Sequence, residues 1–165
     1  MKKILIIRFS SIGDIVLTSP IIRCVKQQLK NAEVHFITKK QFAPILENNP
    51  YVDKIYRIDK NVSEIFFQLK KENYDFVIDL HHNLRSAHVK YILGKPSASF
   101  RKLNIEKWLM VNLRVNKLPT VHIVDRYFET VKSLPGLSGQ IGVKNDGKGL
   151  DYFIPGKDEV DLKTL

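Results

Sequence analysis

The sequence contains a single cysteine, Cys24, so no internal disulfide can form, and a reducing cytoplasm is the expected location. The helical spacing of apolar residues around Cys24 predicts an inert, buried thiol rather than a nucleophile. Apolar runs are also short, and none approaches the roughly 20 residues that span a bilayer. A signal peptide is not expected, because Met1 to Lys3 lead directly into a short strand-like run followed by Arg8.

Acidic residues are scarce between Asp79 and Asp125, where Glu106 is the only one. The whole chain has 27 Lys and Arg against 17 Asp and Glu, a formal net charge of +10. This stretch carries much of the excess: Arg85, Lys90, Lys95, Arg101, Lys102, Lys107, Arg114 and Lys117. A local excess favours an anionic partner or substrate over a uniformly solvated basic surface. Nucleic acid is a weak candidate, because no binding motif or array of stacking aromatic residues accompanies the charge.

Two glycine-rich phosphate-binding motifs are missing. Neither G-x-G-x-x-G nor G-x-x-x-x-G-K-[ST] occurs in the sequence. Both motifs use glycine to bring backbone N–H groups close to phosphate. Dinucleotide-binding proteins and P-loop nucleotide hydrolases are therefore disfavoured.

Strand and helix patterns alternate along the chain. Lys3–Ile7 is a β-branched apolar run without polar alternation, which is typical of a central parallel strand covered on both faces. Four more strands are predicted over 33–38, 54–58, 76–78 and 98–101, with helices over about 15–29, 42–46, 62–69, 84–93, 105–113 and 124–131. The mixed polarity of 54–58 places that strand near an edge. The alternation predicts an α/β, Rossmann-like, doubly wound parallel sheet with strand order 3-2-1-4-5.

Proline and glycine mark two boundaries. Pro20 either kinks a helix that begins near Gly13 or opens the main helix after a separate turn over 13–18, and the sequence leaves both open. Pro135 and Gly136 end the last predicted helix. The residues beyond them are glycine-bearing and aperiodic. We therefore expect one globular domain over 1–136 and a linker over 137–165.

The first candidate site is the turn after the first strand, which contains Ser10, Ser11, Gly13 and Asp14. Parallel sheets place ligands at the carboxyl ends of their strands, where the first N–H groups of the next helix are unpaired. Asp14 has two interpretations. It is either an acid that stabilises the helix dipole, or a general base for a substrate hydroxyl.

A second polar segment, Asp79 to Ser86, follows the fourth strand. The predicted strand order places it beside the Ser10–Asp14 turn. His81, His82 and His88 match no common metal-ligand spacing, so no metal is expected, and polar contacts or helix capping are favoured. Arg85 is either a clamp for phosphate or carboxylate or a solvated helix residue.

The segment from Lys102 to Arg114 places Trp108 and Leu109 among basic residues. This composition would suit an anionic membrane surface, although a helix packed on the sheet explains it too. His122 and Arg126 lie one helical turn apart and can reach the same side.

Three segments together resemble the family 9 glycosyltransferases, the ADP-heptose:lipopolysaccharide heptosyltransferases. They are residues 4–20 (ILIIRFSSIGDIVLTSP), residues 74–80 (YDFVIDL) with Arg85-Ser86, and residues 122–127 (HIVDRY). The resemblance implies a GT-B enzyme with two Rossmann-like domains. The amino-terminal domain binds the acceptor and the carboxyl-terminal one the nucleotide sugar, and transfer inverts the anomeric centre without a required metal.

The resemblance also implies roles for individual residues. Asp14 becomes the general base, Ser10, Ser11 and Gly13 shape the turn around it, and Arg85 faces an acidic acceptor. Our expected acceptor-binding set is Ser10, Ser11, Gly13, His81, Asn83 and Arg85. The implied acceptor is the anionic lipopolysaccharide inner core on a membrane lipid, so peripheral contact with the cytoplasmic face of the inner membrane is an open expectation.

The chain is about half the usual size of a two-domain enzyme. We therefore expect an amino-terminal half that is inactive alone, holds no cofactor, and leaves the donor, expected to be ADP-heptose, to a missing domain. The alternative is a non-catalytic basic module that binds lipopolysaccharide, anionic membrane or nucleic acid.

Overall fold

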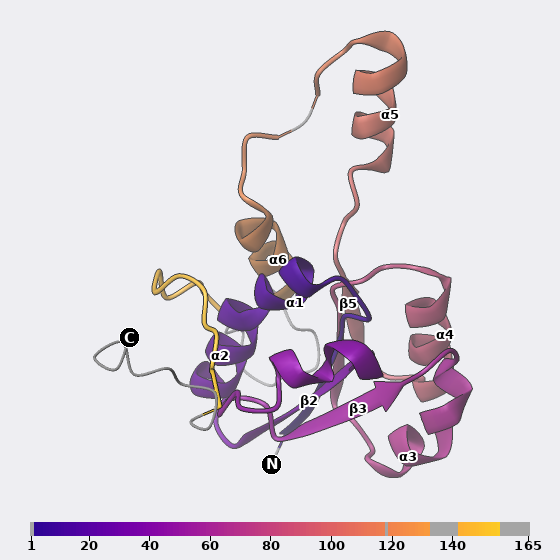
Figure 1. Cartoon of the computed structure of the whole chain (residues 1–165), viewed down its shortest axis with the longest axis vertical. Helices are drawn as coiled ribbons and strands as arrows, with labels where there is room; N and C mark the ends of the chain where they lie inside the picture. The colour runs from indigo at the N-terminus through magenta and orange to yellow at the C-terminus, as the bar shows by residue number, and fades with distance from the viewer. Residues whose placement is uncertain (1, 118, 133–141, 156–165) are drawn as a thin grey trace, which may run out of the picture.

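The computed structural model describes residues 2–117, 119–132 and 142–155. Its centre is a five-stranded parallel sheet in the order β3-β2-β1-β4-β5 (Figure 1). The strands are β1 (Lys2–Ile7), β2 (Ala32–Lys39), β3 (Lys54–Ile58), β4 (Phe76–Asp79) and β5 (Ser97–Ser99). The predicted fold class, strand order and edge position of β3 are confirmed. The fifth strand begins and ends earlier than the predicted 98–101.

The helices follow the strands in alternation. They are α1 (Ile12–Val16), α2 (Ser19–Gln28), α3 (Phe66–Lys71), α4 (Leu84–Leu93), α5 (Asn104–Leu113) and α6 (Ile123–Val131), with 3-10 turns η1 (Lys40–Ile45) and η2 (Val62–Ile65). Of the two possibilities at Pro20, the separate turn is observed. Pro20 lies in the first turn of α2, where its missing N–H has no helical acceptor to lose.

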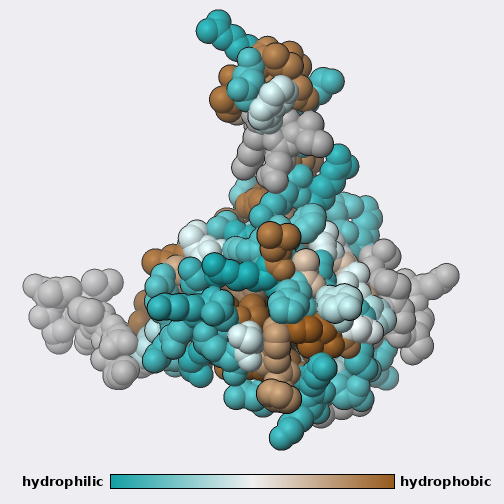
Figure 2. Space-filling view, turned by 90° about the vertical axis from the view of Figure 1, so that its right-hand side faces the viewer, coloured by the Kyte–Doolittle hydropathy of each residue, from teal (hydrophilic) through white to brown (hydrophobic). Residues whose placement is uncertain are grey.

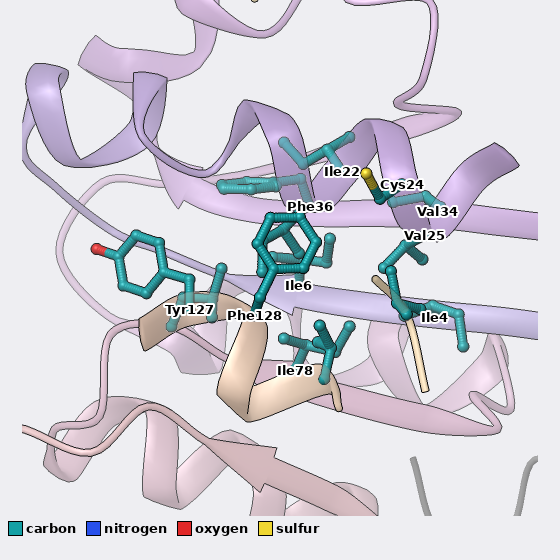
Figure 3. Close-up of a cluster of buried hydrophobic side chains, with 14 of the residues drawn as sticks. Ile4, Ile6, Ile22, Cys24, Val25, Val34, Phe36, Ile78, Tyr127 and Phe128 are labelled. Carbon is teal, nitrogen blue, oxygen red and sulfur yellow. The ribbon is translucent and has the colours of Figure 1, made fainter. Parts of the chain in front are cut away.

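Both faces of the sheet are buried. Ile4 and Ile6 pack in the cluster that includes α2 and α6, whereas Leu5 and Ile7 pack on the other face. Figure 3 shows Phe128 of α6 over the strand residues of the first cluster. Each fully buried isoleucine contributes roughly 1.5–3 kcal/mol to the stability of the fold. The apolar run from Ile4 to Ile7 therefore stabilises the centre of the sheet from both faces.

Part of the predicted linker lies against the domain. Within residues 142–155, Val143 is buried in the α2/α6 cluster and its N–H donates to the Val131 carbonyl (3.1 Å). Arg23 of α2 is only 2% exposed and donates to both carboxylate oxygens of Asp146 (2.8 and 2.7 Å) and to Asp151. Residues 137–141 and 156–165 of the predicted linker lie outside the described residues.

The helix α5 projects away from the sheet (Figure 1), so packing on the sheet does not explain its apolar residues. In the described part of the chain, no helix is both long and apolar enough to cross a membrane.

Arg23 should fasten residues 142–155 to α2. We expect Arg23→Met to lower the free energy of unfolding by about 1–3 kcal/mol, because charge-assisted hydrogen bonds to two carboxylates are lost. Limited proteolysis should then cut within 142–155 faster. The matched control is Arg57→Met, which removes an exposed ion pair to Glu47 (3.0 Å) and should cost about 1 kcal/mol or less. Equal effects of the two variants would contradict this role of Arg23.

Candidate functional site

The turn between β1 and α1 holds Asp14 at the carboxyl end of the central strand. Asp14 lies in the first turn of α1, and its Oδ2 accepts hydrogen bonds from the Ser11 N–H (3.2 Å) and the Ser11 hydroxyl (2.9 Å). The carboxylate is 36% exposed, so it reaches solvent while one oxygen is held. This arrangement stabilises the helix terminus and also presents the carboxylate to a ligand.

Arg8 joins this turn to the loop after β4. Its Nε donates to the Ser10 carbonyl (2.7 Å), Nη1 donates to the Leu80 carbonyl (2.5 Å), and Nη2 pairs with Asp14 Oδ2 (2.5 Å). The Leu80 N–H in turn donates to the Ile7 carbonyl (3.1 Å). The predicted adjacency of the two loops is confirmed, because β1 and β4 are neighbours in the sheet.

The carboxylate of Asp14 is held in its ionised form. Desolvation is the largest influence and raises its pKa, but the hydrogen bonds from Ser11 and the positive charge of Arg8 outweigh it and lower the pKa below its usual value. Both hydrogen bonds from Ser11 and the 2.5 Å contact with Arg8 use Oδ2. Among the described residues, Oδ1 accepts no hydrogen bond, so it can accept a proton from a ligand.

A cavity of about 360 Å³ opens beside Asp14. Its lining comes from the residue after β1, from α1, from the segment after β5 and from α6: Arg8, Asp14, Phe100, Lys102, Leu103, Ile123, Arg126 and Tyr127. Three cations and one carboxylate thus share the wall of this cavity. Arg126 is held in place, because its Nη2 donates to the Arg101 carbonyl (2.8 Å) and its guanidinium lies 4.8 Å from the centre of the Phe100 ring. The cavity suits an anionic ligand that also carries a hydroxyl group.

Two buried polar atoms near this cavity lack a partner. The hydroxyl of Tyr127, which lines the cavity, and Nδ1 of His81 have none among the described residues. Burial, the largest cause, together with the charges of Arg8 and Lys102 lowers the pKa of His81 to about 4. His81 is therefore neutral at pH 7, and its ring lies edge-on to Phe9 with centroids 5.1 Å apart. Unpaired buried polar groups are costly, so a ligand that pairs with them gains affinity.

Gly13 leaves space beside Asp14 that the fold does not need. A Cβ atom at this position would meet no heavy atom within 4 Å, and the backbone is not in the left-handed region. Neither packing nor backbone strain therefore explains the glycine.

The other predicted site residues lie farther from the cavity. Asn83 caps α4, because its Oδ1 accepts from the Ser86 N–H (2.9 Å). Arg85 is exposed, does not line the cavity, and has no partner in the described part of the chain. Their role in acceptor binding stays a prediction. His122 caps α6 and lines a different hollow from Arg126, so the sequence interpretation that both reach one side finds no support.

Of the lining residues, only Asp14 was a predicted site residue. Sequence reasoning missed the other seven: Arg8, Phe100, Lys102, Leu103, Ile123, Arg126 and Tyr127. Arg8 offered a signal, because a charged residue directly after a buried strand lies at the ligand-binding end of the sheet.

The loop after β4 is held by the fully buried Asp79, whose Oδ1 accepts from the N–H groups of His81 (3.1 Å) and His82 (2.7 Å).

A possible metal-ligand group lies at the opposite, amino-terminal end of the strands. Glu33, His35 and Glu72 have ligand atoms within 4.8 Å of one another. The ammonium of Lys3 pairs with both carboxylates, at 3.7 Å from Glu33 and 2.5 Å from Glu72. The Lys3 ammonium therefore already supplies a positive charge to the two carboxylates of this group.

Comparison with known proteins places the chain among sugar transferases. Residues 62–147 match the model of glycosyltransferase family 9 (heptosyltransferase). The curated lipopolysaccharide heptosyltransferase 1 of Campylobacter coli is 33% identical over 122 residues, which are 70% of this chain and 36% of that protein. Lipopolysaccharide heptosyltransferase 3 of Escherichia coli is 33% identical over 78 residues, 41% of this chain and 23% of that protein.

Solved structures share the fold. A family 9 glycosyltransferase from Veillonella parvula superposes with a TM-score of 0.66 at 19% identity, over 94% of this chain and 46% of that one. The E. coli heptosyltransferase WaaC with ADP superposes with a TM-score of 0.64 at 18% identity, over 90% of this chain and 50% of that one. The chain therefore spans about a third or less of the length of these curated relatives and about half of the length of these solved structures.

The charge environment of His81 can be tested by NMR. Titration of its ring should show a midpoint near pH 4, and Arg8→Gln should raise this midpoint, because one of the cations that disfavour protonation is removed. The midpoint should stay below 6.5, since burial remains. Arg57→Gln is the control and should change nothing. A wild-type midpoint above 6, or no response to Arg8→Gln, would show that His81 does not face Arg8 in a buried environment.

Proposed function

Because the chain belongs to glycosyltransferase family 9, we propose that it supplies the acceptor-binding half of an enzyme that transfers heptose from a nucleotide sugar to the lipopolysaccharide inner core. One observation carries this proposal. Asp14 has one oxygen held by Ser11 and Arg8, and its other oxygen accepts no hydrogen bond from the described residues, in a cavity wall that also contains three cations. This is the chemistry that a hydroxyl on an anionic acceptor requires.

The cations suit the acceptor, and the carboxylate suits the reaction. Arg8, Lys102 and Arg126 can bind phosphate or carboxylate groups of a sugar core, the two arginines by paired hydrogen bonds. The relatives named above are lipopolysaccharide heptosyltransferases, which supports this acceptor class. A lipid-linked acceptor also leads us to propose that the chain acts at the cytoplasmic face of the membrane.

The proposed step is a single inverting displacement. Asp14 Oδ1 takes the proton of the acceptor hydroxyl while the oxygen of that hydroxyl attacks the anomeric carbon of the donor. The bond from that carbon to the phosphate oxygen of the donor breaks on the opposite face, and the nucleoside diphosphate leaves with the electron pair. Because Ser11 and Arg8 lower the pKa of Asp14, the carboxylate is a weak base, and its contribution comes from being positioned close to the hydroxyl. The nucleotide sugar, proposed to be ADP-heptose, would bind a second domain.

Asp14→Asn should separate binding from chemistry. We would replace the corresponding part of the C. coli relative by residues 1–155, which keeps the segment that packs on α2. With ADP-heptose as donor and lipopolysaccharide core as acceptor, kcat should fall by about 10²–10⁴. The acceptor KM should change little, because the three cations remain. The 165-residue chain alone should show no turnover.

A direct binding measurement keeps this test independent of the chimera. Isothermal titration of the isolated chain with core acceptor should give similar affinity for wild type and Asp14→Asn, and weaker affinity for Arg126→Gln. The distant Arg57→Gln serves as the matched control. Full activity of the Asp14→Asn chimera would refute the general base. A chain that binds the acceptor although the wild-type chimera shows no transfer would favour the non-catalytic basic module.

Gly13→Ala tests whether the space beside Asp14 serves the ligand. In α1 the new methyl group would contact no other atom, so the free energy of unfolding should stay the same or rise by about 0.5–1 kcal/mol. Acceptor binding should nonetheless weaken, because the methyl group occupies room beside the carboxylate. Unchanged acceptor affinity in a stable Gly13→Ala protein would show that the glycine has no role in the site.

A further inference from the structure

The segment 101–117, which we call the arm, exposes apolar side chains away from the body of the molecule. It contains α5 and the chain on either side of it, and Figure 1 shows it projecting beyond the sheet and the other helices. Trp108 is 56% exposed, Val111 74% and Leu113 58%. Figure 2 shows apolar residues gathered at the same end of the molecule.

Such a helix is not expected to stand alone in water. Isolated helices shorter than about 12–15 residues are marginal, and most helices in proteins depend on packing of an apolar face. In the described part of the chain, α5 makes at most sparse contact with other helices and strands. Exposed apolar patches of this kind mark interaction sites. The arm therefore requires a covering surface.

The charges of the arm indicate what covers it. It contains five basic residues and one acid, Glu106, which pairs with Arg101 at 3.4 Å. Arg114 and Lys117 are exposed at the carboxyl-terminal side of α5. Apolar side chains between exposed cations complement the headgroups and acyl boundary of an anionic bilayer. A second copy of the arm would instead bring like charges together.

The arm also begins at the cavity. Lys102 and Leu103 line the same cavity as Asp14, and α5 follows directly. We propose that the arm docks on an anionic phospholipid surface, with Trp108 and Val111, which lie three residues apart on one side of α5, inserted at the headgroup level. If the proposed function holds, docking of the arm places the cavity next to a lipid-linked acceptor.

Trp108 is the only tryptophan in the chain, so its fluorescence reports on the arm alone. Vesicles of phosphatidylglycerol and phosphatidylethanolamine should shift the emission of the 165-residue chain to shorter wavelength, and phosphatidylcholine vesicles should do so weakly. Val111→Glu should weaken binding roughly tenfold or more. Phe67→Glu is the matched control, because Phe67 is an equally apolar, 84% exposed residue of α3, far from the arm.

The basic residues give a second, independent readout. Arg114→Gln with Lys117→Gln should weaken binding by about fivefold for each charge removed, and added salt should weaken the wild type similarly. Absence of a shift, equal affinity for both vesicle types, or equal loss in Phe67→Glu would overturn the proposal. So would sedimentation that shows Trp108 buried in a dimer. Vesicle binding needs neither donor nor acceptor sugar, so its failure is distinguishable from failure of the proposed transfer.

Discussion

The guanidinium of Arg8 is the contact on which the site depends. It holds the Ser10 carbonyl in one loop and the Leu80 carbonyl in the next, and pairs with Asp14. Three roles thus rest on a single side chain that the central strand delivers to the carboxyl edge of the sheet. The hydrogen bonds from Ser11 and this ion pair together keep Asp14 ionised and fix one of its oxygens. The other oxygen is available beside a cationic cavity, which is how a structural ion pair coexists with a proposed general base.

Much of the fold could be predicted because its determinants are local. The unbroken apolar run at Ile4–Ile7 indicated a strand buried on both faces, and the alternation of strands with helices limited the connections to right-handed crossovers. That order alone brought the Ser10–Asp14 turn beside the loop after Asp79, since adjacent parallel strands end at the same edge. Asp14 itself could be singled out by its place after β1 and by the family resemblance.

What escaped prediction depends on contacts between residues far apart in the sequence. Arg23 binds Asp146, 123 positions away, so a segment that looked like a linker is in part fastened to α2. Arg126 reaches the cavity through its contacts with Phe100 and the Arg101 carbonyl, which no spacing within α6 reveals. The projection of α5 was equally hidden, because an exposed apolar helix and a packed one share the same pattern.

The most direct test of the account is the structure of the chain bound to a lipopolysaccharide core acceptor. We expect an acceptor hydroxyl within about 2.6–3.2 Å of Asp14 Oδ1, with Oδ2 still held by Ser11 and Arg8. Anionic groups of the core should lie against Lys102 and Arg126. An acceptor bound elsewhere, or an Asp14 whose two oxygens are both occupied by Arg8 in the complex, would contradict the proposed general base.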